Sequence, residues 1–119
     1  MRTVAKNAWR LEFGFGIELD QSGKRISKKR QAVALKAIRR LATKLYGGCT
    51  LVETVGDWLD PKTGLLHSET GRTLIVYVEG DFSKVEYRAR KETIVQAIKV
   101  GLKQAAVAFC LSEVRFKIL

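Results

Sequence analysis

The stretch that decides the fold is residues 47–80, which read GGCTLVETVGDWLDPKTGLLHSETGRTLIVYVEG. Thr50 to Val55 is rich in β-branched residues and stops at Gly56, as expected of a strand that ends in a bend. Thr73 to Val78 is apolar after its first residue, which predicts a central strand buried on both faces. We therefore expect the two strands to pair as an antiparallel hairpin.

The segment between these strands, residues 57–71, is the predicted tip of the hairpin. Residues 60–64, Asp-Pro-Lys-Thr-Gly, have the composition of a turn, because proline pre-sets one backbone dihedral and Gly64 accepts a positive one without steric cost. Trp58 should anchor the tip by burying its rings while its indole N–H meets an acceptor. His67, the only histidine of the chain, lies in the same segment.

A first strand is predicted on the N-terminal side of this hairpin, because apolar residues alternate strictly with other residues over positions 9–18. Successive side chains of a strand point to opposite faces, so the apolar set should face the core. That set is Trp9, Leu11, Phe13, Phe15 and Ile17, and it alternates with Arg10, Glu12, Gly14, Gly16 and Glu18. Residues 1–8 are expected to form a short, loosely held lead-in.

Two helices are predicted, one on each side of the hairpin. Ser27 can cap the first helix, which should run to about Tyr46 and stop at Gly47. The second helix should begin at Asp81 or Ser83 and continue to about Ala106. The first has a buried stripe at helical spacing, formed by Leu35, Ile38, Leu41, Ala42 and Leu45.

The predicted order of elements is strand, helix, strand, strand, helix, strand, with the last strand beginning at Glu113. This order favours an α+β, ferredoxin-like fold (βαββαβ), in which two helices cover one face of a four-stranded antiparallel sheet. Residues 1–119 should form one domain, because no linker or internal repeat interrupts the pattern. Such a sheet leaves its second face open, and the apolar run from Leu74 to Val78 indicates that this face is covered. We therefore predict a homo-oligomer, either a dimer or a larger assembly.

The hairpin also carries a recognisable set of residues, namely Gly48-x-Thr50, Gly56-x-Trp58, Gly64 and Glu69. This signature resembles that of a family of small bacterial and phage-type proteins of unknown function. The similarity extends loosely to residues 11–14 and Gly23, so it covers roughly half of the chain. The family implies a ferredoxin-like α+β fold and supplies no activity or catalytic residues. The very basic first helix departs from the family's pattern.

Length and composition are those of a soluble globular protein, with 119 residues, 46% hydrophobic and 29% charged. No run approaches the roughly 18 consecutive apolar residues that a membrane span needs. Residues 1–6 lack the apolar core of a signal peptide, so we predict a cytoplasmic protein. Cys49 and Cys110 lack metal-ligand spacing and are expected to be buried free thiols in a reducing compartment.

The positive charge is concentrated in one segment. The chain has a net charge of +10, from 22 Lys and Arg against 12 Asp and Glu. Residues 24–44 contain nine cations and no acid, which leaves thirteen cations against twelve acids elsewhere. A helix with cations only should present one basic surface, and such a surface attracts phosphates or polyanions.

Groups suited to catalysis are scarce in the sequence. His67 has no nucleophile beside it in the sequence, and residues 14–16 lack the further glycine that a dinucleotide fingerprint requires. Asp57, Asp60 and Glu69 could gather at the hairpin tip for acid–base work or to hold a metal, but turn and cap duties explain the aspartates more simply. We therefore predict a non-enzymatic protein with no catalytic residue, no metal site and no cofactor.

The predicted function is binding of a phosphate-rich anionic ligand of nucleotide size. A basic oligomer can hold phosphates with arginine and lysine and stack an aromatic ring on the base. A phage protein that sequesters a host nucleotide signal would fit this size and composition. The predicted phosphate-binding residues are Arg25, Lys29, Lys36, Arg39, Arg40 and Lys44, and the predicted stacking or tip residues are Trp58, Tyr77 and His67.

Two other classes of function remain open at this stage. The first is a weakly sequence-specific DNA- or RNA-binding protein that relies on phosphate contacts from the first helix, since the first-strand aromatics belong to the core face. The second is a protein-interaction module that docks on an acidic partner. Strong salt dependence would favour nucleic acid, and one deep pocket at a subunit interface would favour a small molecule.

Overall fold

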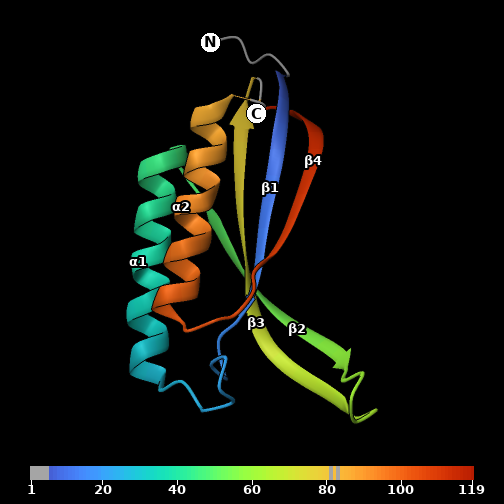
Figure 1. Ribbon diagram of the computed structural model, residues 1–119. Coiled ribbons are helices and arrows are strands. Elements are labelled where there is room, and N and C mark those ends of the chain that lie inside the picture. Colours follow the sequence, from blue (N-terminus) through green and yellow to red (C-terminus); the bar gives the residue numbers. More distant parts are fainter. Residues whose placement is uncertain (1–5, 81, 83) are drawn as a thin grey trace.

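The computed structural model describes residues 6–80, 82 and 84–119, and Figure 1 shows its elements. It is elongated, with principal extents of 54 × 29 × 29 Å. The elements in chain order are β1 (Lys6–Gly16), α1 (Lys28–Tyr46), β2 (Thr50–Leu59), β3 (Leu66–Glu79), α2 (Val85–Gly101) and β4 (Ala108–Phe116). The four strands form one antiparallel sheet of order β2-β3-β1-β4, and both helices lie on one side of it (Figure 1). The predicted ferredoxin-like α+β fold is therefore confirmed.

The first strand follows its predicted alternation. Leu11, Phe13, Phe15 and Ile17 are buried in the core beneath the helices, and Trp9 packs against this core from a half-buried position. β1 lies in the centre of the sheet, because it pairs with β3 on one edge and with β4 on the other. It begins at Lys6, so the strand takes up the last part of the predicted lead-in 1–8, and residues 1–5 lie outside the described residues.

The first helix has the predicted ends. The Ser27 hydroxyl accepts a hydrogen bond from the backbone N–H of Arg30 at 3.1 Å, which caps the start of α1. Gly47 ends the helix with a φ of 83°, a left-handed conformation that glycine adopts without strain. Ala34, Ile38 and Ala42 are buried against the sheet. Local sequence alone thus defines this element.

The second helix and the last strand differ from their predicted bounds. Asp81 and Ser83, the predicted caps, lie outside the described residues, and the N-cap of α2 is Lys84, which makes no side-chain cap hydrogen bond. The helix ends at Gly101, and Lys103 then takes a positive φ of 49° that turns the chain back. This early end leaves room for β4, which begins at Ala108 because it pairs with β1 along nine residues.

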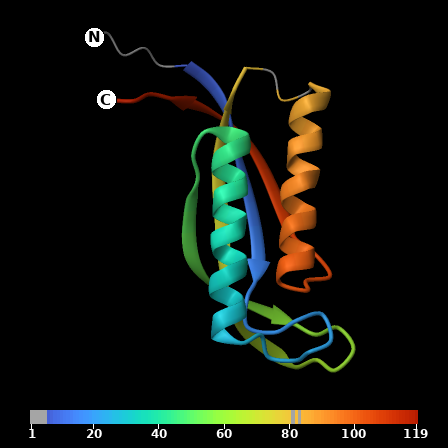
Figure 2. The same cartoon turned by 90° about the vertical axis from the view of Figure 1, so that its left-hand side faces the viewer.

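The hairpin tip is much shorter than the predicted segment 57–71. β2 continues through Gly56 to Leu59, and β3 begins at Leu66, so only residues 60–65 form the turn. Pairing with Glu69 satisfies the backbone at Gly56, so the glycine does not break the strand. The outer half of this hairpin extends beyond the helices as an arm (Figures 1 and 2).

Both helices lie on one side of the sheet, so no helix or strand of the described residues covers its second face (Figure 1). The apolar run of β3 is divided between the two faces, since Leu74, Val76 and Val78 belong to the core. Ile75 and Tyr77 stand opposite Glu12 and Arg10 of β1, on the uncovered face. Cys49 and Cys110 are both free thiols, as predicted, but neither is buried as expected, because Cys49 is half-buried and Cys110 is exposed on β4. No helix within the described residues is long and apolar enough to cross a membrane.

Candidate functional site

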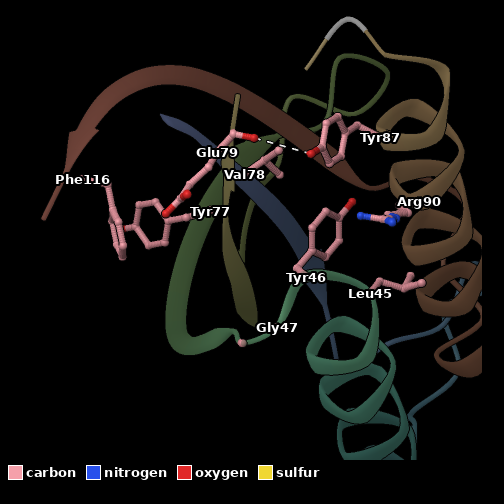
Figure 3. Close-up of a pocket in the computed structure, with 10 residues that line it drawn as sticks. Leu45, Tyr46, Gly47, Tyr77, Val78, Glu79, Tyr87, Arg90 and Phe116 are labelled. Atoms are coloured by element: carbon pink, nitrogen blue, oxygen red, sulfur yellow. Dashed lines mark hydrogen bonds between the residues drawn. The ribbon is translucent and has the colours of Figure 1, made fainter. Parts of the chain in front are cut away.

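A pocket of about 410 Å³ lies where the end of α1, the start of α2 and the end of β3 meet (Figure 3). We refer to it as the aromatic pocket. It is open on one side because β2 begins at Thr50, opposite Ile75, so the last residues of β3 have no neighbour from β2. The lining residues are Leu45, Tyr46, Gly47, Gly48, Tyr77, Val78, Glu79, Tyr87, Arg90 and Phe116.

Aromatic rings form two walls of this pocket. The ring centroids of Tyr77 and Phe116 lie 5.0 Å apart at an interplanar angle of 35°, a separation typical of attractive ring pairs. On the side of α2, the Arg90 guanidinium lies over the Tyr87 ring, 5.5 Å from its centroid. The Tyr87 hydroxyl also donates a hydrogen bond to the backbone carbonyl of Glu79 at 3.5 Å, which ties α2 to β3.

The Tyr46 hydroxyl is the most unusual polar group of the pocket. It is buried and has no hydrogen-bond partner among the described residues, although Figure 3 shows it directed toward the Arg90 guanidinium. Burial raises the pKa of Tyr46 to about 12, and the positive charge of Arg90 opposes this rise. A buried hydroxyl without a partner costs roughly 1–3 kcal/mol, so its retention is expected where a ligand completes its hydrogen bond.

Together these groups can recognise a small molecule that has a flat ring and charged ends. The rings of Tyr77 and Phe116 suit the face of a heterocycle, and Tyr46 can donate or accept a hydrogen bond. The Arg90 guanidinium suits a carboxylate, whereas Glu79 favours a cation. The volume is within the range of roughly 300–1,000 Å³ that is usual for small-molecule sites.

The structure separates Tyr77 from the other two predicted stacking or tip residues, Trp58 and His67. Tyr77 lines the aromatic pocket, whereas His67 lies in the outer arm of the hairpin, paired with Trp58 of β2. Ten residues of an extended strand separate His67 from Tyr77, which is about 33 Å. The three residues therefore do not form one site. For Trp58 only the backbone is described, so the predicted anchoring by its side chain lies outside the described part of the chain.

The predicted phosphate-binding residues do share one region, but it is not the aromatic pocket. Lys29, Lys36, Arg39, Arg40 and Lys44 are all exposed on α1, and Arg25 is exposed in the loop before it. Lys36, Arg39 and Arg40 line an open hollow of about 460 Å³ together with Thr43 and Cys49. The Cys49 thiol bonds the backbone carbonyl of Arg39 at a sulfur–oxygen distance of 3.7 Å, which fixes the loop beside the helix.

The carboxylates of the hairpin do not form a metal site. Among the described residues, no group of three or more His, Cys, Asp and Glu side chains is placed to hold a metal ion. Asp60 caps its turn by accepting the backbone N–H of Lys62 at 2.8 Å, and this bond lowers the pKa of Asp60. Asp57 accepts a hydrogen bond from the Ser68 hydroxyl across the hairpin.

Glu69 stands apart from these aspartates. It lies beside Gly16 and Gly71 in a shallow depression of about 290 Å³ where the hairpin bends away from the sheet. Desolvation raises the pKa of Glu69, and the negative charge of Glu18 raises it further. A Cβ atom on Gly16 would clash with the Glu69 carboxylate in its present position, so the glycine leaves this flexible side chain room to lie there. Catalytic carboxylates often have raised pKa values, but a packed surface acid shows the same shift.

Sequence reasoning missed most of the aromatic pocket. Tyr46, Tyr87 and Arg90 belong to two different helices, and Phe116 belongs to the last strand. No spacing in the sequence connects these four residues, because only the folded chain brings them together. The one available signal was the end of α1 at Gly47, which places the preceding aromatic residue at the end of a helix.

Comparison with known proteins supports the fold and gives no family. No protein-family model matches the sequence, and no curated protein matches it either. Among solved structures, a phage SAM lyase in complex with S-methyl-5′-thioadenosine has a TM-score of 0.63 and 15% sequence identity, covering 93% of this chain and 88% of the lyase. CutA from Synechococcus elongatus PCC7942 has a TM-score of 0.57 and 9% identity, covering 96% of this chain and 83% of CutA.

A Bacillus cereus protein related to NIF3 matches 96% of this chain with a TM-score of 0.55 and 8% identity, but the match covers only 27% of that longer protein. At such identities the similarity concerns the fold. The lyase nevertheless contradicts the prediction of a non-enzymatic protein, because an enzyme is built on this fold over nearly its whole length. That prediction relied on a histidine without a neighbouring nucleophile and on the lack of a dinucleotide fingerprint, and a lyase reaction requires neither feature.

Proposed function

We propose that this protein binds S-adenosylmethionine in the aromatic pocket and cleaves it to S-methyl-5′-thioadenosine. The observation that carries the proposal is the pocket itself, with its ring pair, its guanidinium and its buried Tyr46 hydroxyl without a partner. The similarity in fold to a SAM lyase that holds S-methyl-5′-thioadenosine makes this the first ligand class to test. This nucleoside replaces the phosphate-rich ligand expected from the sequence, because Arg90 is the one cation among the described residues that line the pocket.

The charges of the pocket match those of the proposed substrate. S-adenosylmethionine has a flat adenine, a sulfonium cation, and an amino acid end with one carboxylate. The ring faces of Tyr77 and Phe116 attract both a flat base and a cation, and Glu79 adds negative charge beside them. Arg90 can pair with the carboxylate at the opposite wall. Tyr46 then gains the hydrogen bond that it lacks in the free protein.

The proposed cleavage balances without any further reactant. The bond between sulfur and the γ-carbon breaks, and its electron pair goes to sulfur, which becomes a neutral thioether. The substrate's own carboxylate oxygen forms the new bond to that carbon, which gives a lactone and requires no proton transfer. Charge is lost from sulfur in this step, so a partly apolar pocket favours the product side more than water does. The described lining holds no histidine, and this route needs none.

The test combines binding with turnover. Calorimetry should detect binding of S-methyl-5′-thioadenosine and of S-adenosylmethionine, and mass spectrometry should detect the thioether accumulating from S-adenosylmethionine. Arg90→Ala should weaken binding of S-adenosylmethionine at least tenfold and leave the thioether nearly unaffected, because the thioether has no carboxylate. Arg88→Ala is the matched control, since Arg88 is exposed on the same helix and does not line the pocket.

Two results would overturn the proposal. If neither compound binds at millimolar concentration, the aromatic pocket is not a nucleoside site. If both bind but no thioether forms above the rate without protein, the cleavage step is wrong and only the binding remains. An Arg88→Ala effect equal to that of Arg90→Ala would show that net charge, and not the pocket, sets the affinity.

The assembly state forms a second part of the proposed function. The outer arm exposes large apolar side chains, with Val55 at 77%, Leu59 at 64% and Leu66 at 69% exposure. These side chains favour the predicted homo-oligomer, because an exposed apolar arm is a frequent contact between subunits. Native mass spectrometry should find a mass of two or more chains, and Leu59→Asp with Leu66→Asp should yield the single chain. A single chain in the unsubstituted protein would overturn this part.

A further inference from the structure

The outer face of α1 carries a row of positive charge, which the exposed Val33 interrupts between Lys29 and Lys36. Positions that repeat every three or four residues lie on one side of a helix, and the buried residues Ala34, Ile38 and Ala42 define the opposite side. Lys36, Arg40 and Lys44 follow one another at intervals of four residues, which is a rise of about 6 Å each. With Lys29 the row spans about 22 Å along the helix. All four side chains are exposed.

Nothing in the described part of the chain neutralises this row. The ion pairs found there are Arg10–Glu12, Arg72–Glu53 and Lys91–Glu92, and none of them involves α1. The first turn of α1 contains no acid, although acids are favoured at a helix N-terminus. Like charges at intervals of four residues repel one another, so the row costs stability in the free protein. A bound polyanion would remove that repulsion.

The row leads into the hollow beside β2. Lys36 and Arg40 belong to both the row and the hollow, and Arg39 adds a third cation at its side. Thr43 lines the same space, and its hydroxyl lies 3.7 Å from the Cys49 thiol. The loop that closes the hollow is fixed by Cys49, whose thiol bonds the Arg39 carbonyl. Three cations therefore converge on one concave surface.

We infer that this face of α1 binds the phosphate backbone of a nucleic acid. An extended row of charge suits an extended polyanion, because a single nucleotide reaches only neighbouring cations of the row. Phosphate contacts alone carry no sequence information, so binding is independent of sequence. No aromatic residue belongs to the row or lines the hollow, so the surface does not select unpaired bases. This surface is separate from the aromatic pocket and does not depend on the proposed cleavage.

The composition of the face favours nucleic acid over an acidic protein. Protein interfaces usually have an apolar centre with aromatic anchors. Val33 is the one large apolar side chain that is exposed on α1, and it lies outside the hollow. Duplex DNA also has the higher charge density, with one phosphate charge per roughly 1.7 Å of axis.

The experiment measures binding of a fluorescent 20-base-pair DNA duplex by anisotropy at several salt concentrations. The unsubstituted protein should bind, with an affinity that falls steeply as salt rises. The triple variant Lys36→Gln, Arg40→Gln, Lys44→Gln should lose at least tenfold in affinity at about 50 mM salt, and its salt slope should fall by roughly two to three. Polyglutamate at equal charge concentration should displace the duplex at least tenfold less well than unlabelled DNA does.

The matched control is Arg88→Gln, Arg115→Gln, Lys117→Gln, which removes the same charge from exposed positions outside α1. This control should keep its affinity within about twofold. Equal losses in both triple variants would overturn the inference, because net charge alone would then drive binding. Equal displacement by polyglutamate would overturn it in favour of an acidic protein partner. Acylation footprinting on the unsubstituted protein gives an independent check, in which DNA should protect Lys36 and Lys44 but not Lys117.

Discussion

The aromatic pocket and the basic face of α1 differ in the number of their polar groups and in how far these groups are buried. The pocket gathers a few groups from α1, α2, β3 and β4, and one of them is buried without a hydrogen-bond partner. The face of α1 takes many cations from one helix, and all of them are exposed. Buried groups act in a medium of lower dielectric, so each has a large effect on affinity. Exposed cations act through their number, and salt weakens them together.

This difference explains why the two surfaces should respond differently to substitution. A single change in the pocket should alter affinity for one compound and leave polyanion binding intact. A single change on α1 should have a small effect, and only several changes together should abolish binding. Most of the net charge of +10 comes from residues 24–44, and it therefore gives no information about the pocket.

The largest effect is expected from Tyr77→Ala. This change removes one wall of the ring pair, and stacking of a base on an aromatic ring contributes roughly 1–3 kcal/mol. Affinity for S-methyl-5′-thioadenosine should fall about tenfold to a hundredfold in calorimetry. DNA binding should stay unchanged in the same preparation. A parallel loss of DNA binding would mean that the two surfaces are not independent.

Tyr46→Phe should separate stability from ligand binding. The hydroxyl is buried without a partner in the free protein, so its removal should raise the free energy of unfolding by about 1 kcal/mol in denaturant titrations. Affinity for the nucleoside should fall several-fold, because the ligand loses a hydrogen bond. Arg40→Gln on α1 is the control and should change stability by less than about 0.5 kcal/mol. Lower stability in Tyr46→Phe would show that the hydroxyl is satisfied in the free protein.

The pH dependence of the free energy of unfolding tests the raised pKa of Tyr46. Its pKa is about 12 in the folded protein and 10 as the ordinary value, so the folded state holds the phenol proton more tightly. The corresponding stability is fully present below pH 10 and is lost as pH rises from 10 to about 12. Over this window the free energy of unfolding should fall more steeply in the unsubstituted protein than in Tyr46→Phe. Parallel curves would contradict the raised pKa.

A substitution on α1 should also raise stability while it weakens binding, but by smaller amounts. Lys29→Glu places an acid in the first turn, where it interacts favourably with the helix dipole, and should stabilise the protein by roughly 0.3–1 kcal/mol. The same change should weaken DNA binding twofold to tenfold, measured by anisotropy at about 50 mM salt. Lys117→Glu changes the charge equally away from the helix and should do neither.

The smallest effect is expected from Glu69→Gln. The pKa of Glu69 is raised, so the folded state favours its protonated form. The stability that this protonated carboxyl contributes is lost as pH rises through that pKa. Removing the charge should therefore stabilise the protein at pH 7 by less than about 1 kcal/mol and have almost no effect at pH 4. Thermal unfolding at the two pH values measures this difference. A loss of S-adenosylmethionine turnover with unchanged stability would instead make Glu69 part of the reacting site.

The elements whose ends and buried faces depend only on neighbouring residues were predictable from the sequence. Ser27 and Gly47 specify both ends of α1 through a cap and a left-handed turn, which need only neighbouring residues. The alternation of β1 identifies its buried face because a strand has a period of two. The tip of the hairpin was predicted too long, since Gly56 and Glu69 pair across the sheet and no local signal reveals a pairing partner.

The candidate site was far less predictable than the fold. The cations of α1 were identified because they lie close together in one segment, and because the residue type alone gives the charge at each position. The pocket depends on how the ends of α1 and α2 meet β3, where Tyr46, Arg90 and Phe116 lie far apart in the sequence. Tyr77 was singled out as a ring on the central strand, but its partner Phe116 was identified only as part of the last strand.

The central position of β1 has a consequence for how the protein folds. β2 and β3 form a hairpin from neighbouring parts of the chain, whereas Lys6 pairs with Phe116 across almost the whole described sequence. Closing such a long loop costs more chain entropy than closing a hairpin, and many non-local pairs slow folding. The hairpin should therefore form early, and β4 should add to the sheet last. Until it does, one edge of β1 is unpaired and open to a strand of another chain.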